Sequence, residues 1–243
     1  MINLLIFHKI CDQRTEQFED VSLVILKDIL ADRCYEFPTI DELRNSTVAR
    51  KQVGLTFDDG NSSDFHLVFP VLREHFARAT FFVVTRWLDQ PGFLTTKQVR
   101  ELHRAGMQIG SHSSSHPDFR KLSTAERSRE LEESRKTLED ITGAVISTFA
   151  FPYGFEPEDA IDAVMAAGYS HCCTSRHGVM RGMTSVMPRN SINSGMTPDA
   201  VRRVLAAEWD TRLVWKLEDT GKAALKSSLP HAYPTIRAWL ARK

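Results

Sequence analysis

The chain has 243 residues, 42% of them hydrophobic, so it can bury a large core and fits an ordinary single α/β domain. Its 31 lysine and arginine residues balance 31 aspartate and glutamate residues, which gives a formal net charge of zero. This balance argues against a protein that holds nucleic acid by bulk charge, so no nucleic-acid partner is expected.

The N-terminal stretch 2–7 is apolar, and no basic segment precedes it. This pattern predicts a first buried strand rather than a signal peptide or a membrane span. The four cysteines lack the spacing of a metal site, and neighbours such as Cys172 and Cys173 rarely bridge each other. We therefore expect a reduced, cytoplasmic protein without a transmembrane segment, and peripheral contact with a membrane stays open.

Strand-like apolar runs alternate along the chain with segments of helical periodicity. The predicted strands cover 2–7, 53–57, 79–84, 107–110, 148–151 and 169–174, with a further strand-like piece before Pro188. The predicted helices cover 64–77, a segment capped by Thr95 that stops near Gly106, 124–142 and 156–167, whereas 18–31 fits either a helix or a strand. The part from Pro198 is predicted to be helical and polar, with three packing anchors, Trp209, Trp215 and Trp239.

No linker or repeat divides the chain. Repeated β-then-α units predict one α/β, barrel-like domain over residues 1–243, with its active face at the carboxyl ends of the strands. The motif-bearing core is expected to cover about residues 1–195, and the helical tail about residues 196–243.

Two pairs of candidate metal ligands follow predicted strands. Asp58 and Asp59 come directly after strand 53–57, and His112 and His116 come after strand 107–110. Aspartate and histidine together suit zinc or a neighbouring transition ion, with an open position for water. An Asp-Asp pair can also be a strand-end turn, and the two histidines can face solvent, but the combination favours a divalent-metal hydrolase site.

Three motifs resemble those of the polysaccharide deacetylase (NodB-homology, carbohydrate esterase family 4) superfamily in order and spacing. They are Thr56-Phe-Asp58-Asp59-Gly60, Gly110-Ser-His112-Ser-Ser-Ser-His116-Pro117 and Phe149-Ala-Phe-Pro152-Tyr-Gly154. The stretch 79–83 is similar to that family's second strand, and the resemblance covers roughly residues 1–195. It implies a distorted (β/α) barrel with seven strands and metal-dependent removal of an acyl group from a sugar.

The resemblance also implies site residues. Asp58 would be the general base, and the metal ligands would be Asp59, His112 and His116. Zn2+ is the expected metal, with Co2+, Ni2+ or Mn2+ as alternatives. The oxyanion would be stabilised by a backbone N–H near Pro152 and Tyr153, although Tyr153 could instead only pack.

The general acid departs from the family's common pattern. His231 lies in a tail that does not resemble the late Leu-x-x-His-like motif of many members. His8, at the end of the first predicted strand, instead resembles the Tyr-His of the branch that de-N-acetylates poly-N-acetylglucosamine and related biosynthetic saccharides. This likeness predicts His8 as the general acid, and the alternative is a structural histidine that closes the strand.

A second departure is Ala150, which stands where the family usually has an arginine that pairs with the catalytic aspartate. Arg189 is a candidate to supply this cation to Asp58 from a later strand, and the alternative is an arginine in a surface ion pair. Three bulky residues could line a sugar subsite or belong to the core, namely Trp87, Leu88 and Phe93.

Three classes of function follow. The favoured class is a metal-dependent hydrolase that removes an N-acetyl group from an amino sugar in polysaccharide or glycolipid biosynthesis, with an N-acetylated saccharide or glycolipid as substrate. The second is a deformylase of a lipid-linked amino sugar or another amidohydrolase. The third is a catalytically degenerate, saccharide-binding barrel, which the retained base and ligands argue against.

Overall fold

The structure is a computed structural model. It describes residues 1–13, 17–43, 51–154, 156–157 and 159–228, the last range as backbone only at 218 and 221–228. Trp239 and His231, for which the sequence raised expectations, lie outside these described residues.

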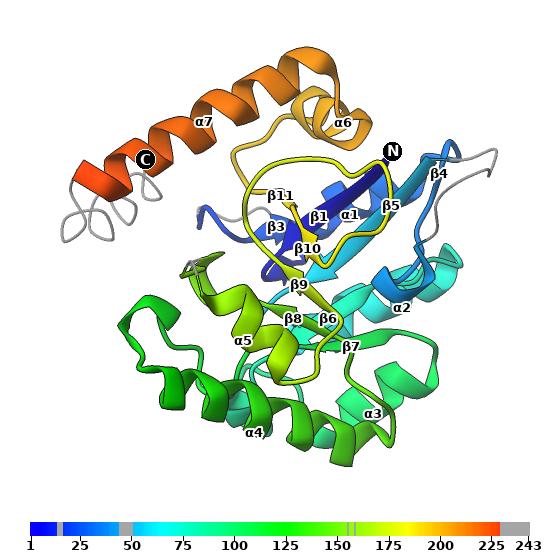
Figure 1. Cartoon of the computed structure of the whole chain (residues 1–243). Helices are drawn as coiled ribbons and strands as arrows, with labels where there is room; N and C mark the ends of the chain where they lie inside the picture. Colours follow the sequence, from blue (N-terminus) through cyan, green and yellow to red (C-terminus); the bar gives the residue numbers. More distant parts are fainter. Residues whose placement is uncertain (14–16, 44–50, 155, 158, 229–243) are drawn as a thin grey trace.

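Parallel strands form a curled sheet at the centre of the molecule (Figure 1). Along the chain they are Ile2–Phe7 (β1), Lys51–Phe57 (β5), Thr80–Val83 (β6), Gln108–Ser111 (β7), Thr148–Ala150 (β8), His171–Cys173 (β9), Val186–Met187 (β10) and Asn190–Ser191 (β11). Their spatial order is β10-β9-β8-β7-β6-β5-β1-β11. Each strand from β5 to β10 therefore lies beside the one that precedes it among the eight strands named above. Such ordering is typical of barrels built from β-then-α units.

One short stretch, residues 186–191, connects the two ends of this sheet. Its first part, β10, pairs in parallel with β9, and its second part, β11, pairs in parallel with β1. If this stretch counts as one strand bent at Pro188, the barrel has seven strands. The predicted (β/α)7 barrel is therefore confirmed.

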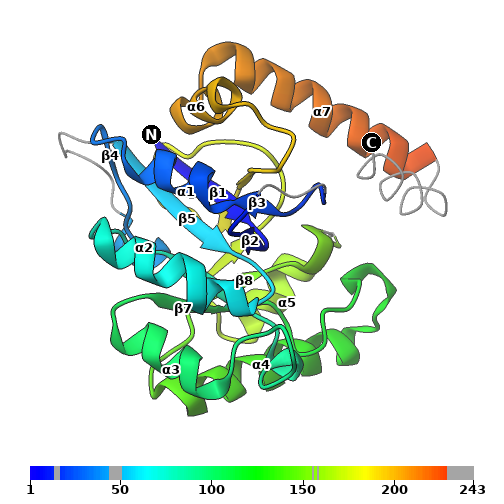
Figure 2. The same ribbon diagram turned by 180° about the vertical axis from the view of Figure 1, so that it is seen from behind.

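Helices surround the sheet in the two opposite views (Figure 1 and Figure 2). The α-helices are Leu23–Leu30 (α1), Phe69–Glu74 (α2), Thr96–Arg104 (α3), Thr124–Thr142 (α4), Ala160–Ala166 (α5), Pro198–Ala206 (α6) and Trp209–Ser228 (α7). The 3-10 turns are Ile40–Glu42 (η1), Thr85–Trp87 (η3), Phe119–Lys121 (η4) and Pro152–Gly154 (η5), and a π-helical turn, Asp64–Val68 (η2), precedes α2. Three short strands complete the fold, namely Ile10–Cys11 (β2), Val21–Ser22 (β3) and Tyr35–Glu36 (β4).

The strands are buried on both faces, which explains why they appear in the sequence as continuous apolar runs. In β1, Leu5 and Phe7 belong to the large cluster that also contains the helix residues. Leu4 belongs to a second cluster with Phe82, on the face that points away from the helices. Side chains alternate between the faces of a strand, so the barrel has one core under the helices and another inside the sheet.

A polar network attaches the C-terminal part to the barrel. The side-chain amide of Asn3 donates to the carbonyl oxygens of Val204 (2.8 Å) and Leu205 (3.2 Å) at the end of α6. Asn190 donates in turn to Asn3 Oδ1 at 2.8 Å. The helical segment after residue 195 therefore contacts the strands directly.

The predicted packing of the tail is correct for one tryptophan and wrong for another. Trp215 is buried, and its ring stacks on His177 with centroids 5.8 Å apart. Trp209, the first residue of α7, is 73% exposed. Helical periodicity alone does not say which side of such a helix meets the core.

Several predicted bounds differ from the structure. The ambiguous segment 18–31 contains both a strand, β3, and a helix, α1, because the Ser22 hydroxyl accepts from Val24 N–H and starts the helix there. The predicted helix 64–77 begins as the π-helical turn η2 and is α-helical only over 69–74.

Phe76 is expected to destabilise the protein slightly, because it has a left-handed backbone (φ 53°) and a side chain that is 97% exposed. Phe76→Gly should raise the free energy of unfolding by about 0.5–1 kcal/mol, since glycine adopts this conformation without a Cβ clash. Urea unfolding would measure this gain. The matched control Phe76→Ala keeps the Cβ and should gain much less, and an equal gain would contradict the backbone explanation.

Candidate metal and hydrolase site

The candidate residues converge at the carboxyl ends of the strands, where barrels of this kind place their sites. Asp58 and Asp59 follow β5, His112 and His116 follow β7, Pro152 and Tyr153 follow β8, His8 follows β1, and Arg189 lies between β10 and β11. Residues that are far apart in the chain therefore share one edge of the curled sheet.

Asp59, His112 and His116 form a group that could hold a metal ion. One ligand atom from each lies within 4.8 Å of the others. Asp59 Oδ1 is 3.6 Å from His112 Nε2 and 3.4 Å from His116 Nε2. Over the described ranges of the chain, this is the one such group of histidine, cysteine and acidic side chains.

The protonation of these groups favours a cation between them. Burial lowers the pKa of His112 and of His116 to about 4, so both rings are neutral at pH 7. His112 Nδ1 lies 2.8 Å from the Ala150 carbonyl oxygen and must donate its proton there, which leaves Nε2 with a lone pair facing Asp59. The buried Asp59 Oδ1 has no hydrogen-bond partner among the described residues. Facing acceptors of this kind suit a divalent metal.

Asp58 lies beside this group and forms a buried ion pair with Arg189. Arg189 Nη1 donates to Asp58 Oδ1 at 2.7 Å and Nη2 donates to Oδ2 at 2.9 Å. The two side chains are 4% and 0% exposed. Burial alone would raise the pKa of Asp58, but the guanidinium outweighs it and lowers this pKa to about 2. Asp58 is thus held as a carboxylate.

The surroundings of Arg189 keep its guanidinium in place. Its Nη1 also donates to Thr56 Oγ1 at 3.0 Å, and its Nε donates to the Thr174 carbonyl at 3.2 Å. The Phe82 ring lies below it, 5.1 Å from the guanidinium carbon to the ring centroid. The structure therefore places this arginine in the barrel interior and not in a surface ion pair.

Aromatic side chains line one side of the candidate metal group. The His116 ring centroid is 5.0 Å from that of Trp87 and 4.5 Å from that of Tyr153. Phe93 packs on Trp87 at 4.8 Å, and Tyr153 is 48% exposed. Because aromatic faces stack on sugar rings, this side of the site is suited to a saccharide.

His8 lies at the end of β1, half-buried, and near enough to Asp58 and Asp59 that a positive charge on its ring would lower the pKa of both carboxyl groups. Pro152 is buried, and Tyr153 has a left-handed backbone (φ 57°). The structure thus brings every predicted site residue to the same edge of the sheet.

Asp64 is a buried carboxyl group that the sequence motifs did not indicate. It lies in η2, and neither side-chain oxygen has a hydrogen-bond partner among the described residues. Burial, with smaller contributions from Asp59 and Asp58, raises the pKa of Asp64 well above its ordinary value. No local pattern in the sequence predicts such burial.

Asp64→Asn is expected to stabilise the metal-free protein at neutral pH. The folded-state pKa of Asp64 is raised, so its contribution to stability is full below about pH 4 and is lost as the pH rises through that pKa. The gain should therefore grow as the pH rises above about 4 and reach about 1–3 kcal/mol at neutral pH. Urea unfolding in the presence of a chelator would measure it, and a gain independent of pH would contradict this explanation.

Comparison with known proteins identifies related sequences. The family model described as polysaccharide deacetylase matches residues 45–172. The peptidoglycan-N-acetylglucosamine deacetylase PgdA of Listeria monocytogenes is 38% identical over 105 residues, which are 43% of this chain. The chain spans only part of such relatives, 22% of the length of PgdA and 55% of that of a Bacillus subtilis relative.

Two solved structures share the fold. The Streptococcus pyogenes deacetylase PplD, solved in complex with acetate, has a TM-score of 0.76 at 23% identity and covers 84% of this chain and 97% of its own. IcaB from Ammonifex degensii has a TM-score of 0.72 at 23% identity, and the match covers 84% of this chain and 95% of the IcaB chain.

Within the described residues, no helix has both the length and the apolar content that a bilayer span requires.

Proposed function

The chain belongs to the polysaccharide deacetylase family, and on this premise we propose that it is a metal-dependent hydrolase that removes an N-acetyl group from an amino sugar. The observation that carries the proposal is the group of Asp59, His112 and His116 next to the ionised Asp58. The relative PgdA is an N-acetylglucosamine deacetylase by name, and this supports an N-acetylated amino sugar as the substrate.

Each residue has a proposed role in the reaction. Asp59, His112 and His116 would hold a divalent metal, which when bound supplies Lewis acidity toward the acyl carbonyl and the attacking water. Asp58 accepts the proton of this water, and Arg189 keeps Asp58 ionised and oriented, at the cost of some basicity. The backbone N–H of Tyr153, next to Pro152, donates to the oxyanion.

The departing amine needs a proton, and we assign this step to His8. The assignment is supported by the place of His8 at the carboxyl end of β1 and by its electrostatic interaction with Asp58 and Asp59. The location in the cytoplasm, the biosynthetic pathway and contact with a glycolipid or a membrane surface stay predictions.

Acetate release from N-acetylglucosamine oligomers tests the proposal. The protein would be stripped with a chelator and reloaded separately with Zn2+, Co2+, Ni2+ or Mn2+. We expect activity to disappear on stripping and to return with one or more of these ions. Formate release from a formylated amino sugar would favour the deformylase alternative, and a metal-loaded protein that binds oligomers but releases neither acid would favour the degenerate barrel.

His8→Ala is expected to lower kcat by about 100-fold or more, because the amine would depart without a proton donor. Steady-state acetate release would measure the loss. His103→Ala is a suitable control because His103 lies on α3, away from the candidate site. A wild-type kcat in His8→Ala would assign the acid role to another group.

A further inference from the structure

The loop that carries both histidines, residues 112–116, has a strained backbone. Ser113 (φ 71°) and His116 (φ 59°) adopt the left-handed conformation without being glycine. Such residues cost of order 1–3 kcal/mol each and persist only where the surroundings hold them. The loop therefore needs contacts that stabilise this particular shape.

Glu130 on α4 supplies those contacts to backbone N–H groups of the loop. Its Oε2 accepts from the backbone N–H of Ser114 at 2.9 Å and from that of Ser115 at 2.8 Å. Its Oε1 accepts from the Ser115 hydroxyl at 2.6 Å. Hydrogen bonds to a carboxylate are roughly twice as strong as neutral ones, so one side chain makes three strong contacts to two adjacent residues.

The other side of the loop is held by backbone groups of η3. Thr85 N–H donates to the Ser113 carbonyl at 3.3 Å, and Arg86 N–H donates to the Ser114 carbonyl at 2.9 Å. In addition, Ser113 Oγ accepts from His116 N–H at 2.9 Å. The loop thus lies between the η3 backbone and the Glu130 carboxylate.

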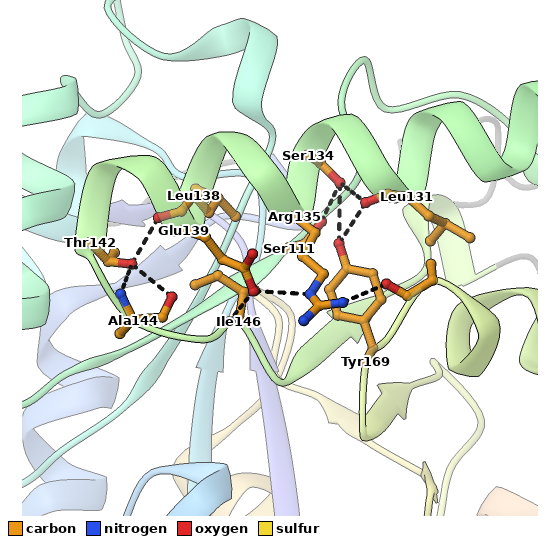
Figure 3. Close-up of polar contacts among 11 residues, drawn as sticks. Ser111, Leu131, Ser134, Arg135, Leu138, Glu139, Thr142, Ala144, Ile146 and Tyr169 are labelled. Atoms are coloured by element: carbon orange, nitrogen blue, oxygen red, sulfur yellow. Dashed lines mark hydrogen bonds and ion pairs between the residues drawn. The ribbon is translucent and has the colours of Figure 1, made fainter.

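Helix α4 is itself firmly attached to the barrel, as Figure 3 shows. Ser134 Oγ lies 2.8 Å from Ser111 Oγ, at the end of the strand that leads to His112. Tyr169 donates from its hydroxyl to the Leu131 carbonyl at 2.9 Å. Glu130, one turn before Ser134, therefore stands on a rigid support.

We propose that Glu130 is a positioning residue for the metal centre. Its carboxylate holds the loop so that His112 and His116 both face Asp59. Within the described part of the chain, Glu130 forms no ion pair that would draw the carboxylate elsewhere. Partners that orient metal ligands commonly affect metal affinity 10- to 100-fold, by order of magnitude. The inference rests on the proposed metal site but not on the proposed substrate.

The test is metal binding without substrate. Zn2+ affinity would be measured on metal-free protein by competition with a chromophoric chelator, and ligand geometry by the visible spectrum of the Co2+-loaded protein. Glu130→Ala should weaken Zn2+ binding about 10- to 100-fold and alter the Co2+ spectrum. Glu130→Gln should weaken Zn2+ binding less than Glu130→Ala but still by more than about twofold, since its amide oxygen can accept from the loop N–H groups but lacks the charge that strengthens these hydrogen bonds.

The matched control is Glu132→Ala, which removes the same charge from an exposed position on α4. It should keep wild-type affinity and spectrum. Circular dichroism identifies the variants that fold, and Glu130→Gln decides the matter if Glu130→Ala does not. Zn2+ affinity within twofold of wild type and an unchanged Co2+ spectrum in the folded Glu130 variants would overturn the proposal. A wild-type protein that binds neither ion would instead overturn the metal site itself.

Discussion

Asp58→Asn is expected to lower kcat by about 100- to 10,000-fold while Zn2+ binding survives. Asparagine cannot accept the proton of the attacking water, and Asp58 is not one of the three residues that could hold the metal. Acetate release and metal content, measured on the same preparation, would show both results.

His112→Ala is the comparison for this variant, because it should lose the metal together with the activity. Asp58→Asn leaves Arg189 without its buried counter-charge, so its folding must be checked at the assay temperature. A near-normal kcat in Asp58→Asn would refute the base assignment. Loss of the metal in this variant would instead make Asp58 a ligand.

Arg189→Met should destabilise the protein by about 3–5 kcal/mol, because it leaves the buried Asp58 without its partner. It should also raise the pKa of Asp58, since burial persists when the opposing guanidinium is gone. The base would then be protonated at higher pH, and the acid limb of the kcat/KM profile would shift upward. Chemical denaturation and a pH–rate profile would measure the two effects.

In the wild-type protein, by contrast, Arg189 lowers the pKa of Asp58 and so stabilises the folded state at neutral pH. The pKa of Asp58 is lowered from 3.8 to about 2, so the ion pair contributes stability above about pH 4 that is lost as the pH falls toward 2. Arg181→Met is a control, because Arg181 is exposed in the loop that leads to β10. An unchanged acid limb in Arg189→Met would show that Arg189 does not control the base.

Elements with strong local signals were predictable. Helix α4 has the predicted bounds, 124–142, because Ser123 and Glu126 form a capping box at its start and Gly143 (φ 70°) ends it. The strands were predictable because burial on both faces produces uninterrupted apolar runs. Segment 18–31 was ambiguous because its continuous apolar run, 23–26, fits a strand as well as a buried helix. Only the contact of Ser22 with Val24 shows where the helix begins.

Contacts between distant parts of the chain were much less predictable. The sequence indicated Arg189 as a partner of Asp58 but left a surface ion pair equally open, because the two residues are 131 positions apart. Glu130 and Asp64 gave no signal of their own. Glu130 has the same local setting as its exposed neighbours on α4, and the burial of Asp64 depends on how η2 packs.

The sequence by itself determined the class of fold and the candidate chemistry, because alternating apolar segments and a short set of aspartate and histidine motifs are local properties. The tertiary structure alone decided which groups act on one another. It closed the barrel through residues 186–191, and it thereby carried Arg189 to Asp58. It also set Glu130 against the histidine loop. Pairings of this kind depend on the relative placement of whole elements, which no short stretch of sequence encodes.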